Sequence, residues 1–66
     1  MKRRDLFRFL KRAGCIILRE GAKHSVFLNP KNNKTGSVPR HNEINNFTAE
    51  GILKDLQLLD KFKQGK

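Results

Sequence analysis

The spacing of the apolar residues changes twice along this chain, and that change limits the folds it can adopt. Residues 3–13 place apolar side chains at helical intervals, whereas the short runs 15–19 and 25–29 are rich in residues that favour strands. Helical intervals return after residue 48. A chain of 66 residues has room for one small hydrophobic core, so we expect residues 1–66 to form a single domain.

The first predicted helix, residues 3–13, has an apolar face and a basic face. Leu6, Leu10 and Ala13 recur at the spacing of one helix face. Four cations fall together on the opposite face: Arg4, Arg8, Lys11 and Arg12. Gly14 follows the last periodic residue, and glycine adopts a left-handed cap at little cost, so we expect the helix to end there.

Three strands are predicted, of which the third is the shortest. The turn around Gly21 separates the two strand-like runs, which we expect to pair in antiparallel fashion. A second turn, residues 30–36, is dense in Pro, Asn, Lys and Gly. Val38 then lies in a short third strand, which Pro39 confines to an edge or an end because proline has no backbone N–H.

A polar connection, residues 40–46, leads to a second predicted helix. Its apolar face consists of Ala49, Ile52, Leu53 and Leu56. We expect Thr48 to be the N-cap and Phe47 to pack against Ile52 as a hydrophobic staple. Asp60 is expected to cap one further short helical turn, which would bury two more apolar side chains, Leu59 and Phe62.

The order of these elements predicts an α+β fold. Both helices of the α-β-β-β-α order can cover one face of a three-stranded antiparallel sheet and leave the other face more open, which makes a two-layer sandwich. A short C-terminal helical turn would extend it. Residues 63–66 are expected to form a frayed basic tail.

The charge of the chain indicates a polyanionic partner. Fifteen Lys and Arg residues against six Asp and Glu residues give a formal net charge of +9. In so short a chain this imbalance creates a positive potential over much of the surface. Nucleic acid is the leading candidate because phosphate contacts supply most of the sequence-independent affinity in such complexes. An anionic membrane surface or an acidic protein remains an alternative at this point.

Targeting and redox features favour a cytoplasmic protein. The apolar residues near the start are interrupted by Arg8 and followed by Lys11 and Arg12, which fits neither a signal peptide nor a transmembrane span. Cys15, the single cysteine, cannot form an internal disulfide and lies in an apolar run, which is typical of a buried structural thiol. We therefore expect a reducing compartment.

The two histidines are the candidate groups for chemistry on RNA. RNA carries its own nucleophile, the 2′-hydroxyl, and cleavage needs that proton removed and the leaving 5′-oxygen protonated. An imidazole suits both tasks because its unperturbed pKa is about 6.5. His24 follows the glycine turn at the start of a strand, so it is the candidate general acid and base. The alternative is that His24 merely caps a turn or packs at a strand end.

Other residues are expected to bind the RNA rather than to cleave it. Lys23 could hold a phosphate beside His24, and Arg40 would present planar donors to phosphate with His41 next to it. His41 is also a candidate second proton-transfer group. The helix cations Arg4, Arg8 and Lys11 would contact the phosphate backbone of the RNA. The spacing of His, Cys and carboxylates matches no metal site, so we expect no metal and no cofactor.

Four fragments resemble the HicA toxins of bacterial toxin-antitoxin pairs, in the family's order and over nearly the whole chain. Met1-Lys2-Arg3-Arg4-Asp5-Leu6, with the Gly14 stop, is similar to the first helix, and Gly21-Ala22-Lys23-His24 to the glycine turn before the functional histidine. Val38-Pro39-Arg40-His41 resembles the exit of the third strand, and Ile52-Leu53-Lys54-Asp55-Leu56 the second helix. The resemblance implies a fold like that of double-stranded RNA-binding domains. It also implies metal-independent cleavage of messenger RNA and neutralisation by an antitoxin of HicB type.

Two other classes of function stay open. The chain could be a binding-only RNA module without cleavage activity, in which His24 contributes nothing to chemistry. It could also be an interaction protein whose basic surface binds an acidic protein, in which case its affinity for RNA at physiological salt would be negligible. A steep fall of RNA affinity with salt, about 0.7 in log units per phosphate neutralised on a single strand, would count against the last class.

Overall fold

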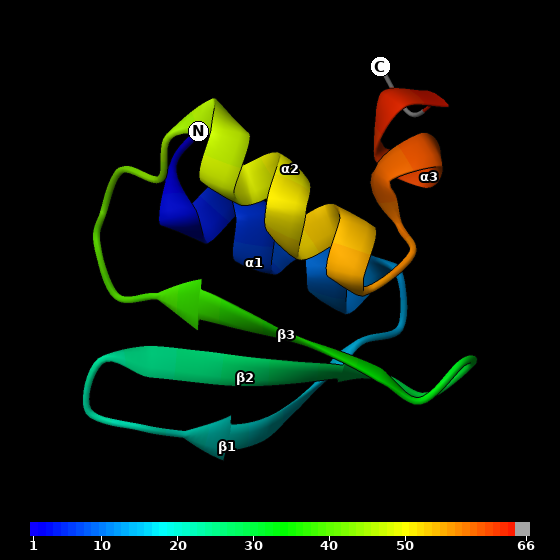
Figure 1. The fold of residues 1–66 in the computed structure, drawn as a ribbon, viewed down its shortest axis with the longest axis horizontal. Coiled ribbons are helices and arrows are strands. Elements are labelled where there is room, and N and C mark those ends of the chain that lie inside the picture. Colours follow the sequence, from blue (N-terminus) through cyan, green and yellow to red (C-terminus); the bar gives the residue numbers. More distant parts are fainter. Residues whose placement is uncertain (65–66) are drawn as a thin grey trace.

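The computed structural model describes residues 1–64, which form helices packed on one antiparallel sheet (Figure 1). Helix α1 spans Arg3–Arg12, strands β1, β2 and β3 span Ile16–Glu20, His24–Asn29 and Lys34–Pro39, and helices α2 and α3 span Asn46–Asp55 and Leu59–Gln64. The strands follow one another in the sheet in the order β1-β2-β3. The predicted α+β sandwich, with its α-β-β-β-α order and short C-terminal helix, is confirmed.

The two faces of the sheet differ in what covers them. Helices α1 and α2 lie on the same side of the sheet, and the other side is bare (Figure 1). Strand β2 reflects this, because Ser25, Phe27 and Asn29 are buried whereas His24 at its start is exposed. Successive side chains of a strand point to opposite faces, so His24 belongs to the bare face.

The core lies between the helices and the sheet and draws on every element except β1 and α3. Phe27 is fully buried and meets Phe7 edge-to-face, with 4.8 Å between the ring centroids. The remaining buried apolar residues are Leu6, Leu10, Ala13, Cys15, Val38, Ile44, Ala49, Ile52, Leu53, Leu56 and Leu58. Among residues 1–64, no helix is long and apolar enough to cross a membrane.

Helix α1 ends as the sequence predicts. Gly14 has a φ of 94°, and the N–H of Cys15 donates to the carbonyl oxygen of Leu10 at 2.9 Å. The N–H of Gly14 donates to Lys11 at 3.1 Å. This pair of bonds is a Schellman motif, which satisfies the last helix carbonyls and turns the chain toward β1.

The N-terminus is fastened to the segment before α2. The Met1 amino group donates to the carbonyl oxygen of Ile44 at 2.9 Å, and the N–H of Ile44 donates back to Met1 at 2.8 Å. Lys2 and Glu43 form an isolated antiparallel bridge next to this pair. The starts of α1 and α2 are thereby held together, although residues 40–45 form no helix or strand beyond this single bridge.

Helix α2 begins earlier than predicted, and two expectations about its start are wrong. Asn45, and not Thr48, is the N-cap, because its Oδ1 accepts from the N–H of Thr48 at 2.7 Å. Phe47 therefore lies inside the first turn, where it is 87% exposed and forms no staple with Ile52. Asparagine accepts the free N–H groups of a first turn as well as threonine does, so sequence alone did not separate the two caps.

The third strand is longer than predicted because the turn before it is shorter. The turn ends at Asn33, whose φ of 59° is in the left-handed region that asparagine tolerates, and β3 starts at Lys34. Gly36, expected in the turn, lies within the strand, where an added Cβ would come within 3.1 Å of Leu56. Its role is to let the end of α2 approach the sheet. Buried Asn29 joins the same region by donating to the carbonyl oxygen of Leu56 at 3.0 Å.

Helix α3 corresponds to the predicted final turn, but Asp60 is not its cap. Asp60 lies inside its first turn rather than before it. Leu59 and Phe62 are half-buried against the core, and Phe62 meets Phe9 edge-to-face. Of the tail predicted as frayed, Lys63 and Gln64 belong to α3, and residues 65–66 lie outside the described residues.

Gly51→Ala is expected to stabilise the protein by about 1 kcal/mol, or roughly 4–8 °C in melting temperature. Gly51 lies in the middle of α2, is exposed, and has no atom within 4 Å of where a Cβ would stand. The matched control is Gly14→Ala, which should destabilise because Gly14 has a positive φ. Thermal unfolding measures both, and equal shifts in the same direction would contradict this account.

Candidate functional site

His24 lies at the rim of the sheet, where β2 begins. The N–H of Gly21 donates to the carbonyl oxygen of His24 at 2.8 Å and closes the turn between β1 and β2. In the sheet, His24 pairs with Pro39 of the neighbouring strand β3. Its side chain is exposed and makes no hydrogen bond or ion pair with any other described residue. The imidazole is therefore open to a ligand.

A surface hollow brings together the four residues that the sequence analysis singled out at this end of the fold. It is lined by Lys23, His24, Arg40 and His41, together with Ala22 and Pro39. The N–H of Arg40 donates to the carbonyl oxygen of Lys23 at 3.2 Å, which holds the two segments together. Lys23 and Arg40, which are 17 positions apart in the chain, meet here because β2 and β3 pair in register. We name this hollow the His24 site.

Arg40 is partly committed to the protein. Its Nε donates to the carbonyl oxygen of Gly21 at 2.9 Å, and its Nη2 donates to Glu20 Oε1 at 3.0 Å. A guanidinium has five N–H donors, so others remain for a phosphate. Glu20 offsets part of its charge, whereas Lys23 is exposed and has no ion-pair partner among the described residues. Lys23 is the less encumbered cation beside His24.

A polar network that the sequence analysis did not identify lies under the His24 site. Arg3 donates from Nε to the carbonyl oxygen of Pro39 and from Nη2 to Ser25 Oγ, both at 3.0 Å. Ser25 is fully buried and donates to Glu20, which also accepts from Arg40. The network joins α1 to all three strands around the start of β2. It depends on strand register, which no local pattern of these residue types reveals.

The helix cations form a second surface apart from the His24 site. Arg4, Arg8 and Lys11 line a shallow groove along α1 with Lys2, Arg3, Phe7, Asn42 and Glu43. The groove and the His24 site have no lining residue in common. Arg3 connects them, because it lines the groove while its guanidinium reaches Pro39. The exposed contact of Arg8 with Asp5, at 3.9 Å, offsets little of this charge.

A third hollow lies on the bare face of the sheet and also contains His24. Its other lining residues are Arg19, Gly21, Ala22, Lys23, Val26 and Ser37. Arg19 and Ser37 both lie opposite Val26 in the two ladders of the sheet. Arg19 and Ser37 were not predicted from the sequence. The alternation of β2 indicates this face, but only the register of β1 and β3 identifies the residues on it.

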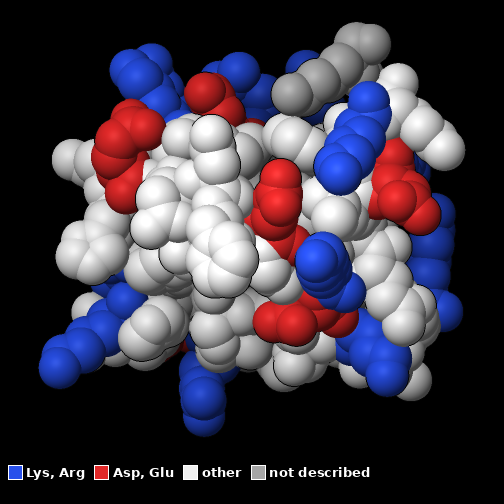
Figure 2. All heavy atoms as spheres, turned by 45° about the horizontal axis from the view of Figure 1, so that its top comes forward, with Lys and Arg blue, Asp and Glu red and all other residues white. Residues whose placement is uncertain are grey.

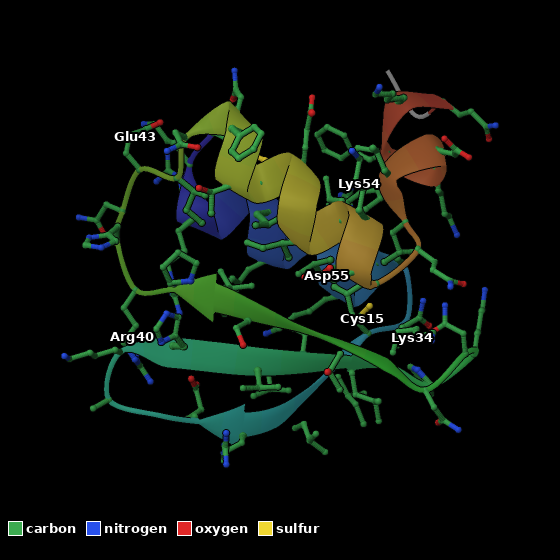
Figure 3. The ribbon with its side chains drawn as sticks, viewed as in Figure 1. Cys15, Lys34, Arg40, Glu43, Lys54 and Asp55 are labelled. Carbon is green, nitrogen blue, oxygen red and sulfur yellow. The ribbon has the colours of Figure 1, made fainter. Side chains whose placement is uncertain are left out.

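Charge is divided unequally between the two parts of the chain. Residues 1–40 hold eleven of the fifteen Lys and Arg residues and only two of the six acidic residues, so residues 41–66 carry no net charge. Figure 2 turns the helix side of the molecule toward the reader and shows acidic side chains across the middle of that face, with most cations at its margins. In Figure 3, Arg40 lies at one end of the sheet and Lys34 at the other. The positive potential thus belongs to α1 and the ends of the sheet.

Cys15 is buried between the sheet and the helices (Figure 3), and burial raises the pKa of its thiol. The thiolate is the reactive form, so we expect Cys15 to react with a disulfide reagent about tenfold or more slowly in the folded protein than in urea. Equal rates would contradict burial. Within the described residues, no three His, Cys, Asp or Glu side chains are close enough together to hold a metal ion.

Comparison with known proteins identifies one relationship. Residues 3–58 match the family model described as the HicA toxin of bacterial toxin-antitoxin systems. The matched segment runs from the start of α1 through α2 and includes His24 and all of the sheet. No curated protein and no solved structure matches the chain.

Proposed function

This chain belongs to the HicA toxin family of bacterial toxin-antitoxin systems, and from that premise we propose that it is an endoribonuclease that cleaves messenger RNA in the cytoplasm. His24 is its general acid and base. The observation that carries the proposal is the His24 site, in which an exposed imidazole with no partner among the described residues shares a hollow with Lys23, Arg40 and His41. The antitoxin of the pair, of HicB type, neutralises the activity.

The proposed reaction uses the 2′-hydroxyl of the RNA as nucleophile. His24 takes the proton from this hydroxyl, and the oxygen attacks the adjacent phosphorus while the bond to the 5′-oxygen breaks. The 5′-oxygen leaves with a proton from the imidazolium, so the histidine returns to its starting form. His41 can share the two proton transfers. The products are a 2′,3′-cyclic phosphate and a 5′-hydroxyl end.

The cations have separate parts in this proposal. Lys23, which has no ion-pair partner among the described residues, neutralises the phosphate under attack, and Arg40 contributes its remaining donors from a fixed position. Arg4, Arg8 and Lys11 bind the RNA backbone along the α1 groove. We expect the side of α2 and α3 to contribute little to RNA binding, since residues 46–64 carry no net charge.

The test is a cleavage assay with purified protein, end-labelled messenger RNA and an excess of EDTA. We expect cleavage in EDTA and fragments that end in a 2′,3′-cyclic phosphate. Fragments that end in a 3′-hydroxyl would require another mechanism. Salt-dependent binding without cleavage would identify a binding-only module, and no binding at physiological salt would identify a protein-interaction domain.

A further inference from the structure

Glu20, the last residue of β1, places a negative charge beside the cations of the His24 site. Its Oε1 accepts from Arg40 Nη2 at 3.0 Å and also from Ser25 Oγ. The side chain is 52% exposed, so its charge faces any RNA that approaches this end of the sheet. A carboxylate repels phosphates, and Glu20 therefore opposes RNA binding. Its hydrogen bonds indicate a different role.

The contacts of Arg40 use one edge of its planar guanidinium. Nε and Nη2 form this edge, and they donate to the carbonyl oxygen of Gly21 at 2.9 Å and to Glu20 Oε1 at 3.0 Å. The opposite edge consists of Nη1 and the outer N–H of Nη2. An open guanidinium edge can donate to two oxygens of one phosphate at once. Gly21 and Glu20 thus fix the plane of the group and leave a phosphate-binding edge free.

Glu20 is itself held from below by the helix side of the sheet. Ser25, which is fully buried, donates to Glu20 and accepts from Arg3 Nη2 at 3.0 Å. Arg3 is fixed in turn, because its Nε donates to the carbonyl oxygen of Pro39 and its guanidinium lies 4.0 Å from the centre of the Phe7 ring. The carboxylate of Glu20 therefore has a defined position, although half of its surface is exposed.

We propose that Glu20 is a positioning residue for RNA cleavage, which acts through Arg40. Glu20 holds the guanidinium in the hollow that Arg40 shares with His24, so that its open edge meets the phosphate on which charge develops. A group that is already oriented loses less conformational entropy when it binds. The proposal rests on the proposed function, because it concerns the phosphate that His24 attacks through the RNA. Glu20 raises the cleavage rate and lowers the RNA affinity.

Two substitutions of Glu20 test these opposite effects. Glu20→Ala removes the charge and both hydrogen bonds, so we expect kcat to fall about tenfold or more. RNA affinity, measured in a His24→Ala background, should be equal to or higher than that of the His24→Ala parent. Glu20→Gln keeps an acceptor oxygen for Ser25 and Arg40, so it should restore kcat to within about threefold of the parent and keep the affinity of Glu20→Ala.

Glu50→Ala is the matched control, because it removes an exposed acidic side chain from α2. Charges that are far apart on the surface are screened by salt, so neither kcat nor RNA affinity should change by more than about twofold.

A further measurement does not depend on cleavage. The Nε–H of Arg40 gives an NMR signal that can be assigned by its loss in Arg40→Lys. We expect this proton to exchange with water about threefold or more faster in Glu20→Ala than in the parent and in Glu20→Gln, because the guanidinium is then held at Gly21 alone. If the parent cleaves no RNA, the proposed function is wrong, and the exchange rate still decides whether Glu20 holds Arg40.

Four results would overturn the positioning role, each in a variant that thermal unfolding has established to be folded. The first is parental kcat in Glu20→Ala. The second is a kcat of Glu20→Gln as low as that of Glu20→Ala, which would assign the effect to charge and not to the hydrogen bonds. The third is a loss of RNA affinity in Glu20→Ala, which would make Glu20 a binding residue. The fourth is an unchanged exchange rate of the Arg40 Nε–H.

Discussion

His24→Ala is expected to lower the rate of messenger RNA cleavage by about 10²- to 10⁴-fold, the contribution of a positioned acid-base group. The upper end applies if one imidazole serves both as base and as acid. The side chain is exposed and without a partner among the described residues, so its removal should leave the unfolding temperature unchanged. RNA affinity should also stay near the parental value, because Lys and Arg supply the phosphate contacts.

His41→Ala is the matched comparison for this result, since His41 lines the same hollow. A loss of tenfold or more would give His41 a share in proton transfer, and a smaller loss would leave it a binding residue. Growth arrest on expression should follow the cleavage rates of the parent and both variants. The proposed mechanism is wrong if folded His24→Ala cleaves RNA as fast as the parent.

Phe27→Ala is expected to cost about 3–5 kcal/mol of the free energy of unfolding. Phe27 is fully buried at the centre of the sheet and packs edge-to-face with Phe7. A single core in a chain this short rarely supplies more than about 3–5 kcal/mol of net stability. The variant should therefore be largely unfolded at room temperature, which circular dichroism and urea titration would detect.

Phe47→Ala is the control for the stability of the core. Its side chain is 87% exposed, so truncation should change the free energy of unfolding by no more than about 0.5 kcal/mol. Similar losses in the two phenylalanine variants would mean that Phe27 is not the centre of the core.

The candidate site was only partly open to prediction from sequence. Histidine chemistry and a glycine turn identified His24 and Lys23, and Arg40 and His41 were predicted to lie on the RNA-binding surface. The structure brings all four to one hollow. Sequence did not reveal that Glu20 and Gly21 bind Arg40, or that Arg3 and Ser25 brace the start of β2. Those contacts cross between strands, and their partners are set by register.

Local physical chemistry determined the elements. Helical and strand-like spacing predicted the order of helices and strands, and Gly14 marked the end of α1 because few other residues accept a φ of 94°. The same local reasoning failed where two residues suit one task. Thr48 was predicted as the N-cap of α2, although Asn45 is the cap. Gly36 was predicted as a turn residue, because Leu56, whose close approach explains the glycine, lies far from it in the sequence.

Tertiary structure decided which surfaces are left open. The apolar run that holds the buried Cys15 continues into β1, yet Ile16 and Leu18 are exposed, because both helices pack on one face of the sheet and β1 lies at its edge. The excess of positive charge in residues 1–40 is set by the sequence, and the packing then places those cations on α1 and at the ends of the sheet. Sequence thus determined the order of the elements and the charge of the chain, and the packing of distant segments decided which surfaces are left open.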